Sequence, residues 1–268
     1  MGSRGLQLTG TMALAVCLAA CGASTSSPPL RTDGTLSVCS YAEFTPISYG
    51  NGEGYEADLL RSIARSWDVQ AKFAPTEVFD GIWMLPSDPA RACDVAIGGI
   101  TPTDERKGQG AVFSPTTATF SQSLLVRRAD FDSGRITDYA SFAGSDMVIG
   151  VVPGTTGESY AQQRAKEAGL PPTVLQQYPS EAELLTALRN GEIDAIARGE
   201  IGNEYQESKD PSVVTIARRS FGEGFAISVD PANAELQTAL AQAIARATKD
   251  GTVGYREWRA DPTVFDRG

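Results

Sequence analysis

The sequence contains no histidine among its 268 residues. Without histidine the chain cannot form the Ser–His or Cys–His pairs that activate many catalytic nucleophiles. It also lacks the usual nitrogen ligand of catalytic zinc, and it has only four cysteines to offer instead. We therefore expect no metal, no cofactor and no enzyme built on a histidine-activated nucleophile.

Basic residues are scarce as well. Lys and Arg number 23 against 33 Asp and Glu, which gives a formal charge of −10, and loss of Arg4 with a cleaved leader changes this to −11. There is no cluster of Lys and Arg, so the composition argues against nucleic-acid binding and against docking to a membrane through a basic patch. A single buried Arg that captures an anion remains compatible with this charge.

The first twenty residues have the character of a leader rather than of a membrane span. Arg4 precedes a largely apolar run, 6–20, that is short and broken by Gly and Thr. The run ends in Leu-Ala-Ala-Cys21, which resembles a bacterial lipoprotein cleavage box. We expect 1–20 to be a signal peptide and Cys21 to be lipidated, with an ordinary secretory peptide as the alternative. The chain is then extracytoplasmic and touches the membrane only through this anchor.

Residues 21–35 are rich in Ser, Thr and Pro and are expected to form a flexible tether. Two cysteines follow it, Cys39 and Cys93, and an oxidising compartment allows them to form a disulfide. Cys39 lies near the end of one expected strand, whereas Cys93 precedes another, and this offset can exceed the about 7 Å that a disulfide allows between Cα atoms. The sequence leaves a bridge and two free thiols equally open.

Beyond the tether, short apolar strands alternate with amphipathic helices. Strands are expected at 36–40, 69–73, 94–100, 123–127, 147–152, 173–177, 194–197, 213–216 and 225–229. Helices are expected at 55–67, 158–168, 180–190 and 234–249. This order favours α/β sheets with parallel strands and helices on the faces, whose ligands collect at the C-terminal ends of the strands.

The segment from Asp94 to Arg106 carries the most chemistry. An apolar strand runs into Gly98-Gly99, where the backbone can come close to a bound group. Thr103 can then cap a helix whose first turn holds Arg106. Exposed amides, hydroxyls and a two-pronged guanidinium suit a carboxylate, although a plain strand-to-helix turn with a surface Arg has the same pattern.

Five motifs, in order, resemble those of the family 3 extracellular solute-binding proteins, the receptor subunits of polar amino-acid ABC importers. They are GYEADLL at 54–60, DVAIGGITPTDER at 94–106, GVVPGTTG at 150–157, LRNGEIDA at 188–195, and KDGT at 249–252 with Trp258 after it. The resemblance covers about 36–259 and implies the type II periplasmic-binding-protein fold, in which two α/β lobes joined by two crossing strands close on a ligand. It places the boundaries at 36–127 (lobe 1, first part), 128–221 (lobe 2), 222–262 (lobe 1, second part) and 263–268 (tail), with crossings near 125–127 and 221–225.

The same resemblance implies a ligand site between the lobes. A carboxylate is expected to bind the groups that follow the lobe 1 strand and open the lobe 2 helix: Arg106, Thr101, the backbone near Gly99, Thr155 and Thr156. An aromatic wall is expected from Tyr41, Phe44 and Phe79. For these rings, packing in the core is an equally open alternative.

One departure from the family pattern bears on the ligand. The family usually places an Asp five residues after the position of Asp194 to hold the ligand's amino group, and here that position is Gly199. Its neighbour Glu200 is the candidate replacement, while Arg198 can repel a cation. Acidic residues such as Glu181 are expected on solvated helix faces. A carboxylate ligand without an ammonium group, such as an aromatic acid, therefore stays open.

These features predict a monomeric binding protein that delivers a small carboxylate-bearing solute, such as an amino acid, to the membrane permease of an ABC importer. A prephenate or arogenate dehydratase on the same fold is the enzymatic alternative, with Glu200 or Glu43 as its general acid. An extracytoplasmic sensor domain is the third alternative.

Overall fold

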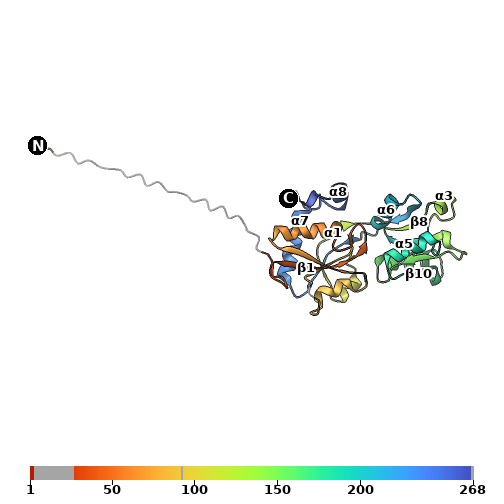
Figure 1. The fold of residues 1–268 in the computed structure, drawn as a ribbon, viewed down its shortest axis with the longest axis horizontal. Helices are drawn as coiled ribbons and strands as arrows, with labels where there is room; N and C mark the ends of the chain where they lie inside the picture. Colours follow the sequence, from red (N-terminus) through yellow and green to blue (C-terminus); the bar gives the residue numbers. More distant parts are fainter. Residues whose placement is uncertain (3–26, 92, 267–268) are drawn as a thin grey trace.

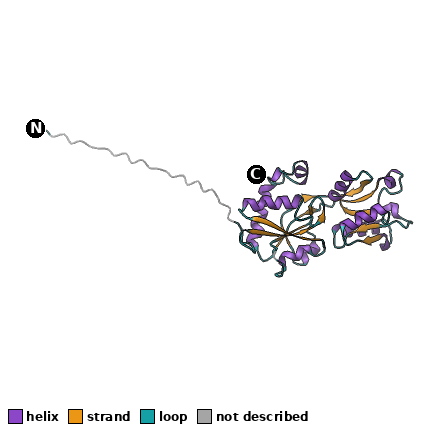
Figure 2. Cartoon of the chain, viewed as in Figure 1, coloured by secondary structure: helices purple, strands orange, loops and turns teal. Residues whose placement is uncertain are grey.

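A computed structural model describes residues 1–2, 27–91 and 93–266 of the chain. Two lobes lie side by side, one holding β1, α1 and α7 and the other β8, β10 and α5 (Figure 1). Each lobe has its own sheet with helices packed around it (Figure 2). Cys21 and nearly all of the expected signal peptide lie outside the described residues, so lipidation stays a prediction.

Lobe 1 is built on a five-stranded sheet. Its strand order is β4 (Gln70–Thr76), β1 (Thr35–Tyr41), β5 (Val95–Ile97), β14 (Ser228–Val229) and β6 (Val112–Phe113). β1 runs parallel to β4 and β5, and Ser40 is paired with Ile97. The ends of β1 and β5 therefore meet at one edge of the sheet, where Tyr41 ends β1 and Gly98 follows β5.

Two long helices form the core of lobe 1 with this sheet. In α1 (Tyr55–Ser66) the residues at helical spacing are buried, including Leu59 and Ile63. The same holds in α7 (Ala234–Ala247) for Leu236 and Leu240. All four belong to one hydrophobic cluster with the strands, which confirms the faces expected from the spacing.

Lobe 2 has a second five-stranded sheet. Its strand order is β10 (Leu175–Gln177), β9 (Ile149–Val151), β11 (Ala195–Gly199), β8 (Gln122–Arg127) and β12 (Val213–Arg219). Its helices are α3 (Arg128–Asp132), α4 (Thr156–Glu167), α5 (Glu181–Asn190) and α6 (Glu200–Lys209). Ser180 caps α5 by accepting a hydrogen bond from the Glu183 amide, and Gly191 ends the helix in a left-handed conformation.

The shorter elements lie in the connections. They are β2 (Glu43–Phe44), β3 (Ser48–Tyr49), η1 (Ile82–Ser87), α2 (Asp104–Gly108), β7 (Ala118–Thr119), η2 (Tyr139–Phe142), η3 (Pro172–Val174), β13 (Gly224–Phe225), α8 (Tyr255–Ala260) and η4 (Val264–Asp266).

The first lobe boundary differs from the one expected. Residues 36–127 were assigned to lobe 1, with a crossing near 125–127, but β8 pairs with β11 and β12 of the lobe 2 sheet. The chain crosses between lobes earlier, beside the pair formed by β7 and β13. Leu124, Leu125 and Val126 are fully buried, and a continuous apolar strand carries no sequence mark of the sheet that it joins.

The part of the chain that is docked on lobe 1 extends beyond the boundaries predicted at residues 36 and 262. The backbone amide of Arg31 donates to the Asp94 carboxylate, and the Arg31 guanidinium pairs with Asp230 at 2.7 Å. Leu30 packs against the lobe 1 core, so the chain is docked before residue 36. At the other end Phe265 is buried, and its carbonyl accepts a hydrogen bond from the Ser62 hydroxyl. Residues 30–31 and Phe265 are therefore fixed to lobe 1.

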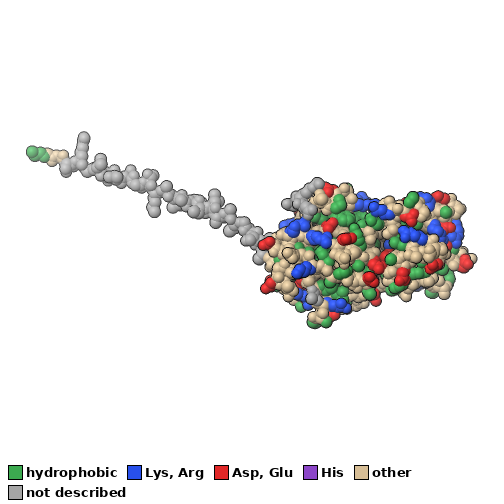
Figure 3. Space-filling view, viewed as in Figure 1, with side chains coloured by type: hydrophobic (Ala, Val, Ile, Leu, Met, Phe, Trp, Pro, Cys, Tyr) green, Lys and Arg blue, Asp and Glu red, His purple; other side chains and the backbone are tan. Residues whose placement is uncertain are grey.

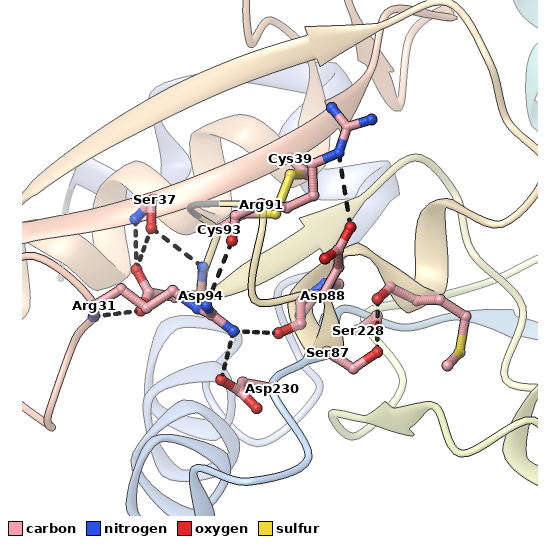
Figure 4. Close-up of a disulfide and its surroundings, with 12 residues drawn as sticks. Arg31, Ser37, Cys39, Ser87, Asp88, Arg91, Cys93, Asp94, Ser228 and Asp230 are labelled. Atoms are coloured by element: carbon pink, nitrogen blue, oxygen red, sulfur yellow. Dashed lines mark hydrogen bonds and ion pairs between the residues drawn. A yellow bond between two sulfur atoms is a disulfide. The ribbon is translucent and has the colours of Figure 1, made fainter.

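Cys39 and Cys93 form a disulfide in the structure (Figure 4). Their Cα atoms are 5.7 Å apart, within the range that a bridge allows. The offset along the sheet is small enough because β1 pairs directly with β5, and the register sets Cys39 opposite Ala96. The bridge ties the start of β5 to the middle of β1.

Basic and acidic side chains are interspersed over the side of the molecule seen in Figure 3. In the part of the chain that the structure describes, no helix has both the length and the apolar character needed to cross a bilayer.

Candidate ligand-binding cleft

A cavity of about 40 Å³ lies between the two lobes. Its walls come from both lobes and from the crossing strands: Tyr41, Phe44, Phe79, Gly98, Gly99, Phe120, Thr155, Thr156, Gly157, Glu181, Arg198, Gly199 and Phe225. This volume is close to that of one or two water molecules. An amino acid needs more space, so a ligand of that size requires the lobes to move apart before they close around it.

Arg106 is not one of the residues that line this cavity, but its buried side chain packs against Phe79, which is. Thr103 caps α2 by accepting a hydrogen bond from the Arg106 amide, as expected, and the Arg106 residue is only 4% exposed. Its guanidinium lies 4.1 Å from the centre of the Trp83 ring and 5.4 Å from that of Phe79, one of the cavity walls. Stacking of this kind fixes the plane of the guanidinium.

The Arg106 guanidinium also joins the lobes. Nη1 donates to the Thr101 carbonyl at 2.7 Å in lobe 1, and Nη2 donates to the Gly154 carbonyl at 2.8 Å in lobe 2. Burial lowers the pKa of Arg106 from 12.5 to about 10, so the group stays charged at neutral pH. Of its five N–H bonds, three make no hydrogen bond to the described residues and can serve an anion.

The predicted threonines meet across the same gap. The Thr101 and Thr156 hydroxyl oxygens are 3.4 Å apart, and the Gln122 side-chain amide donates to Thr156 at 3.1 Å. Thr155 has a capping role at α4, because its hydroxyl accepts from the Glu158 amide and donates to the Val152 carbonyl. Thr156 is therefore the better placed of the two to meet a ligand, at a helix N-terminus that favours anions.

The Gly98-Gly99 turn lies against the aromatic wall. A Cβ at Gly98 would meet Tyr41 at 2.6 Å, and one at Gly99 would meet Phe44 at 2.6 Å, so both positions require glycine. The two backbone amides both donate to the Glu56 carboxylate at 2.9 Å. Gly99, whose backbone was expected near the ligand, lines the cavity, and its N–H donates to Glu56.

Sequence reasoning missed Glu56, which is fully buried under this turn. Burial raises the pKa of Glu56 from 4.5 to about 7, even though hydrogen bonds from Gly98 and Gly99 act to lower it. A raised carboxyl pKa means that the folded state holds the proton at a pH where the unfolded chain has lost it. The contribution of this group to stability therefore falls as the pH rises from about 4.5 to about 7.

We predict that Glu56→Gln removes this pH dependence, which amounts to at most about 3 kcal/mol. The amide oxygen of glutamine can still accept from Gly98 and Gly99, so the turn is retained. The measurement is urea unfolding at several pH values between 4.5 and 7.5. The exposed residue Glu183 provides the control, Glu183→Gln. Parallel curves for Glu56→Gln and the unchanged protein would contradict the assignment.

The aromatic wall is larger than expected. Tyr41, Phe44 and Phe79 all line the cavity. All three also belong to the hydrophobic cluster that forms the lobe 1 core. Phe120 and Phe225 complete the wall from the crossing segments, with ring centres 4.2 Å apart in a stacked pair. These two were missed because they lie in the segments where the chain crosses between the lobes, and the sequence does not show which residues of these segments face the cavity.

Glu200, predicted to hold the ligand's amino group, is not among the residues that line this cavity. Its carboxylate accepts a hydrogen bond from the Ser121 amide at 3.0 Å and lies 3.9 Å from Arg218. It borders a separate hollow of about 780 Å³ beside α8. Gly199 faces the cavity instead, and the next residue, at the start of α6, points away from it.

The charged pair that does line the cavity is Glu181 with Arg198. Glu181 was expected on a solvated helix face, but its side chain is 8% exposed and forms an ion pair with Arg198, whose side chain is 7% exposed. The spacing along α5 could not reveal this, because the partner lies on β11. Among the described residues, no group of three or more Cys, Asp or Glu side chains is arranged to hold a metal ion.

Known proteins share both the sequence pattern and the fold. The bacterial extracellular solute-binding proteins, family 3, match residues 36–259. The L-cystine-binding protein TcyJ of Escherichia coli (strain K12) is 26% identical over 229 residues, which cover 84% of this chain and 81% of that protein. The ABC transporter arginine-binding protein 1 of the same strain is 28% identical over 219 residues, with coverages of 79% and 83%.

Solved structures agree with these relatives. An ancestral arginine-binding protein bound to arginine aligns with a TM-score of 0.72 at 27% identity, covering 85% of this chain and 97% of that one. The ancestral amino acid-binding protein AncCDT-1, a precursor of cyclohexadienyl dehydratase, aligns at 0.71 and 26% identity, with coverages of 85% and 95%. The expected two-lobed α/β fold is confirmed. The chain belongs to the bacterial extracellular solute-binding proteins, family 3.

Proposed function

We propose that this protein is the lipid-anchored, extracytoplasmic receptor of an ABC importer and binds a small carboxylate-bearing solute between its lobes. The solute is an amino acid or a closely related compound. Cys21 is the anchor, and the partner is the importer's membrane permease. The observation that carries the proposal is the buried Arg106 guanidinium, which contacts both lobes and keeps three N–H bonds for an anion.

The surroundings of Arg106 support a carboxylate as the bound group. A guanidinium presents parallel N–H bonds that match the two oxygens of a carboxylate. The N-terminus of α4 faces it from lobe 2, and aromatic rings exclude water that would weaken the attraction. Both lobes contribute, so an anion bound here would favour their closure.

The class of ligand follows from the relatives. Two relatives and one solved structure are named for binding cystine or arginine, which are amino acids. The solved structure, an ancestral arginine-binding protein, aligns with 85% of this chain. An enzyme of the dehydratase kind is less well supported. The carboxylate that lines the cavity belongs to Glu181 and is held in an ion pair, whereas a general acid must have a proton to give.

The test is a thermal-shift screen of the purified protein against all twenty L-amino acids, their keto acids and simple aromatic acids. A ligand at 100 times its dissociation constant adds about 2.7 kcal/mol to the folded state, which raises Tm by about 5–10 °C in a protein of this size. We expect at least one carboxylate compound to do so. A flat screen would contradict the proposal, and turnover of prephenate would replace it with the enzymatic function.

A further inference from the structure

The wall of the cavity contains a buried charged pair, formed by Glu181 and Arg198. Glu181 is the only carboxylate among the described residues that line the cavity. It opens helix α5, and its own backbone amide donates to Glu43 of lobe 1 at 2.9 Å. The carboxylate is thus placed at the junction of the two lobes, where a ligand would be enclosed.

Arg198 holds this carboxylate in place. Its Nη1 pairs with Glu181 Oε2, its Nε donates to Asn203 at 2.6 Å, and its Nη2 donates to the Gly202 carbonyl at 3.1 Å. Asn203 is in turn tied to the Ser123 hydroxyl at 2.9 Å. Every nitrogen of the guanidinium has a partner, so Arg198 acts as a support. Glu181 Oε1 accepts no hydrogen bond from the described residues, so it can accept one from a ligand.

The hydroxyl of Tyr41 is the second unused group. Tyr41 is 2% exposed and lines the cavity, and its hydroxyl oxygen is buried with no hydrogen-bond partner in the described chain. Burial raises the pKa of this phenol, and the nearby carboxylates of Glu181 and Glu43 raise it further, so the group stays neutral. A buried hydroxyl without a hydrogen-bond partner destabilises the folded state unless a ligand or a water molecule forms a hydrogen bond with it.

The charges around this hydroxyl favour a cation. Two carboxylates, Glu181 and Glu43, act on Tyr41 against the single guanidinium of Arg198. A group that bridges the Tyr41 oxygen and the Glu181 carboxylate must donate hydrogen bonds, because a carboxylate can only accept them. A second anion here would meet two like charges. An ammonium group satisfies both partners.

We propose that Glu181 and the Tyr41 hydroxyl form the binding site for the ligand's ammonium group, with Arg198 as the residue that positions Glu181. The inference rests on the proposed function and specifies its ligand as a zwitterion, with the carboxylate toward Arg106 and the ammonium toward Glu181. It also accounts for Gly199, where a Cβ would already meet the Phe120 ring at 3.1 Å. An acidic side chain there would require the Phe120 ring to shift, whereas Glu181 on α5 brings a carboxylate to the cavity without that change.

The experiment is calorimetric titration with matched pairs of compounds that differ only in the amino group. One member is the L-amino acid that gives the largest thermal shift, and the other is its deamino acid, such as 3-phenylpropanoate for L-phenylalanine. The unchanged protein is expected to bind the amino acid at least about tenfold more tightly, as for hydrogen bonds to a charged group. Glu181→Gln should abolish most of that preference and leave affinity for the deamino acid within about threefold.

Two further variants complete the test. Because Glu181→Gln leaves Arg198 buried without its partner, the double variant Glu181→Gln/Arg198→Gln removes both charges together and should lose the same preference. Tyr41→Phe should lower affinity for the amino acid by about three- to tenfold. Tyr139→Phe is the matched control, because that hydroxyl is also buried and unpaired but lies in the lobe 2 core, and its affinities should not change.

Each other outcome counts against the inference. Folded variants of Glu181 that keep the preference for the amino acid would overturn it. A protein that binds the deamino acid as tightly as the amino acid would also overturn it, while leaving the carboxylate site at Arg106 intact. Absence of binding by every carboxylate compound would reject the proposed function itself.

Discussion

Replacing Arg106 with alanine is expected to weaken ligand binding by about 100-fold or more, because the carboxylate then enters a closed cavity without a counter-charge. Loss of one partner of a buried, hydrogen-bonded charge pair costs roughly 2–5 kcal/mol. The same change removes the hydrogen bond that Nη2 makes to Gly154 in lobe 2, so closure is weakened as well. The measurement is calorimetric titration with the compound that gives the largest thermal shift.

Two variants show whether the loss comes from the guanidinium itself. Arg106→Lys keeps the charge but not the two-pronged geometry, and should fall between alanine and the unchanged protein. Arg61 stacks on the Phe73 ring at 4.7 Å but lies away from the cavity, so Arg61→Ala should keep full affinity. If Arg106→Ala is folded and binds normally, the carboxylate does not sit at this side chain.

Removing the disulfide is expected to cause the largest loss of stability. Cys39 and Cys93 are 54 residues apart, and the loop-closure relation for that length gives about 4 kcal/mol, within the usual range of about 2–5 kcal/mol for native bridges. We expect the double variant Cys39→Ser/Cys93→Ser to unfold at a clearly lower urea concentration. Both residues are buried beside the lobe 1 sheet, and neither lines the cavity, so binding should survive wherever the variant is folded.

A reducing agent provides the control for this prediction. Dithiothreitol should shift the unfolding midpoint of the unchanged protein toward that of the double serine variant and should not affect the variant itself. Equal midpoints for the two proteins without reductant would show that the bridge adds nothing to the stability of the fold.

The fold was predictable because its signals are local. Apolar residues at helical spacing in α1 and α7 and the cap at Thr103 all act within a few neighbouring residues. The order of the five motifs, which resembles that of the family 3 solute-binding proteins, then indicated a fold of two lobes. The lobe boundary was misplaced at β8, because the choice of sheet depends on strands far away in the sequence.

The candidate site was predictable only in part. Arg106 and the aromatic residues Tyr41, Phe44 and Phe79 were expected, and the structure brings them to one place. Glu181 was not, because its burial depends on Arg198, which comes from a different element. Glu200 was chosen for its nearness to Gly199 in the sequence, but adjacent residues at a strand end point in opposite directions. An ion pair between residues of different elements leaves no pattern among neighbouring residues of the sequence.

The most direct test of the account is a crystal structure of the protein with the compound that raises its Tm most. We predict that the compound lies between the lobes, with its carboxylate within about 3 Å of the Arg106 guanidinium. The aromatic residues Tyr41, Phe44 and Phe79 should enclose it. A compound bound instead in the hollow beside Glu200, or an Arg106 side chain turned toward solvent, would contradict the central claim.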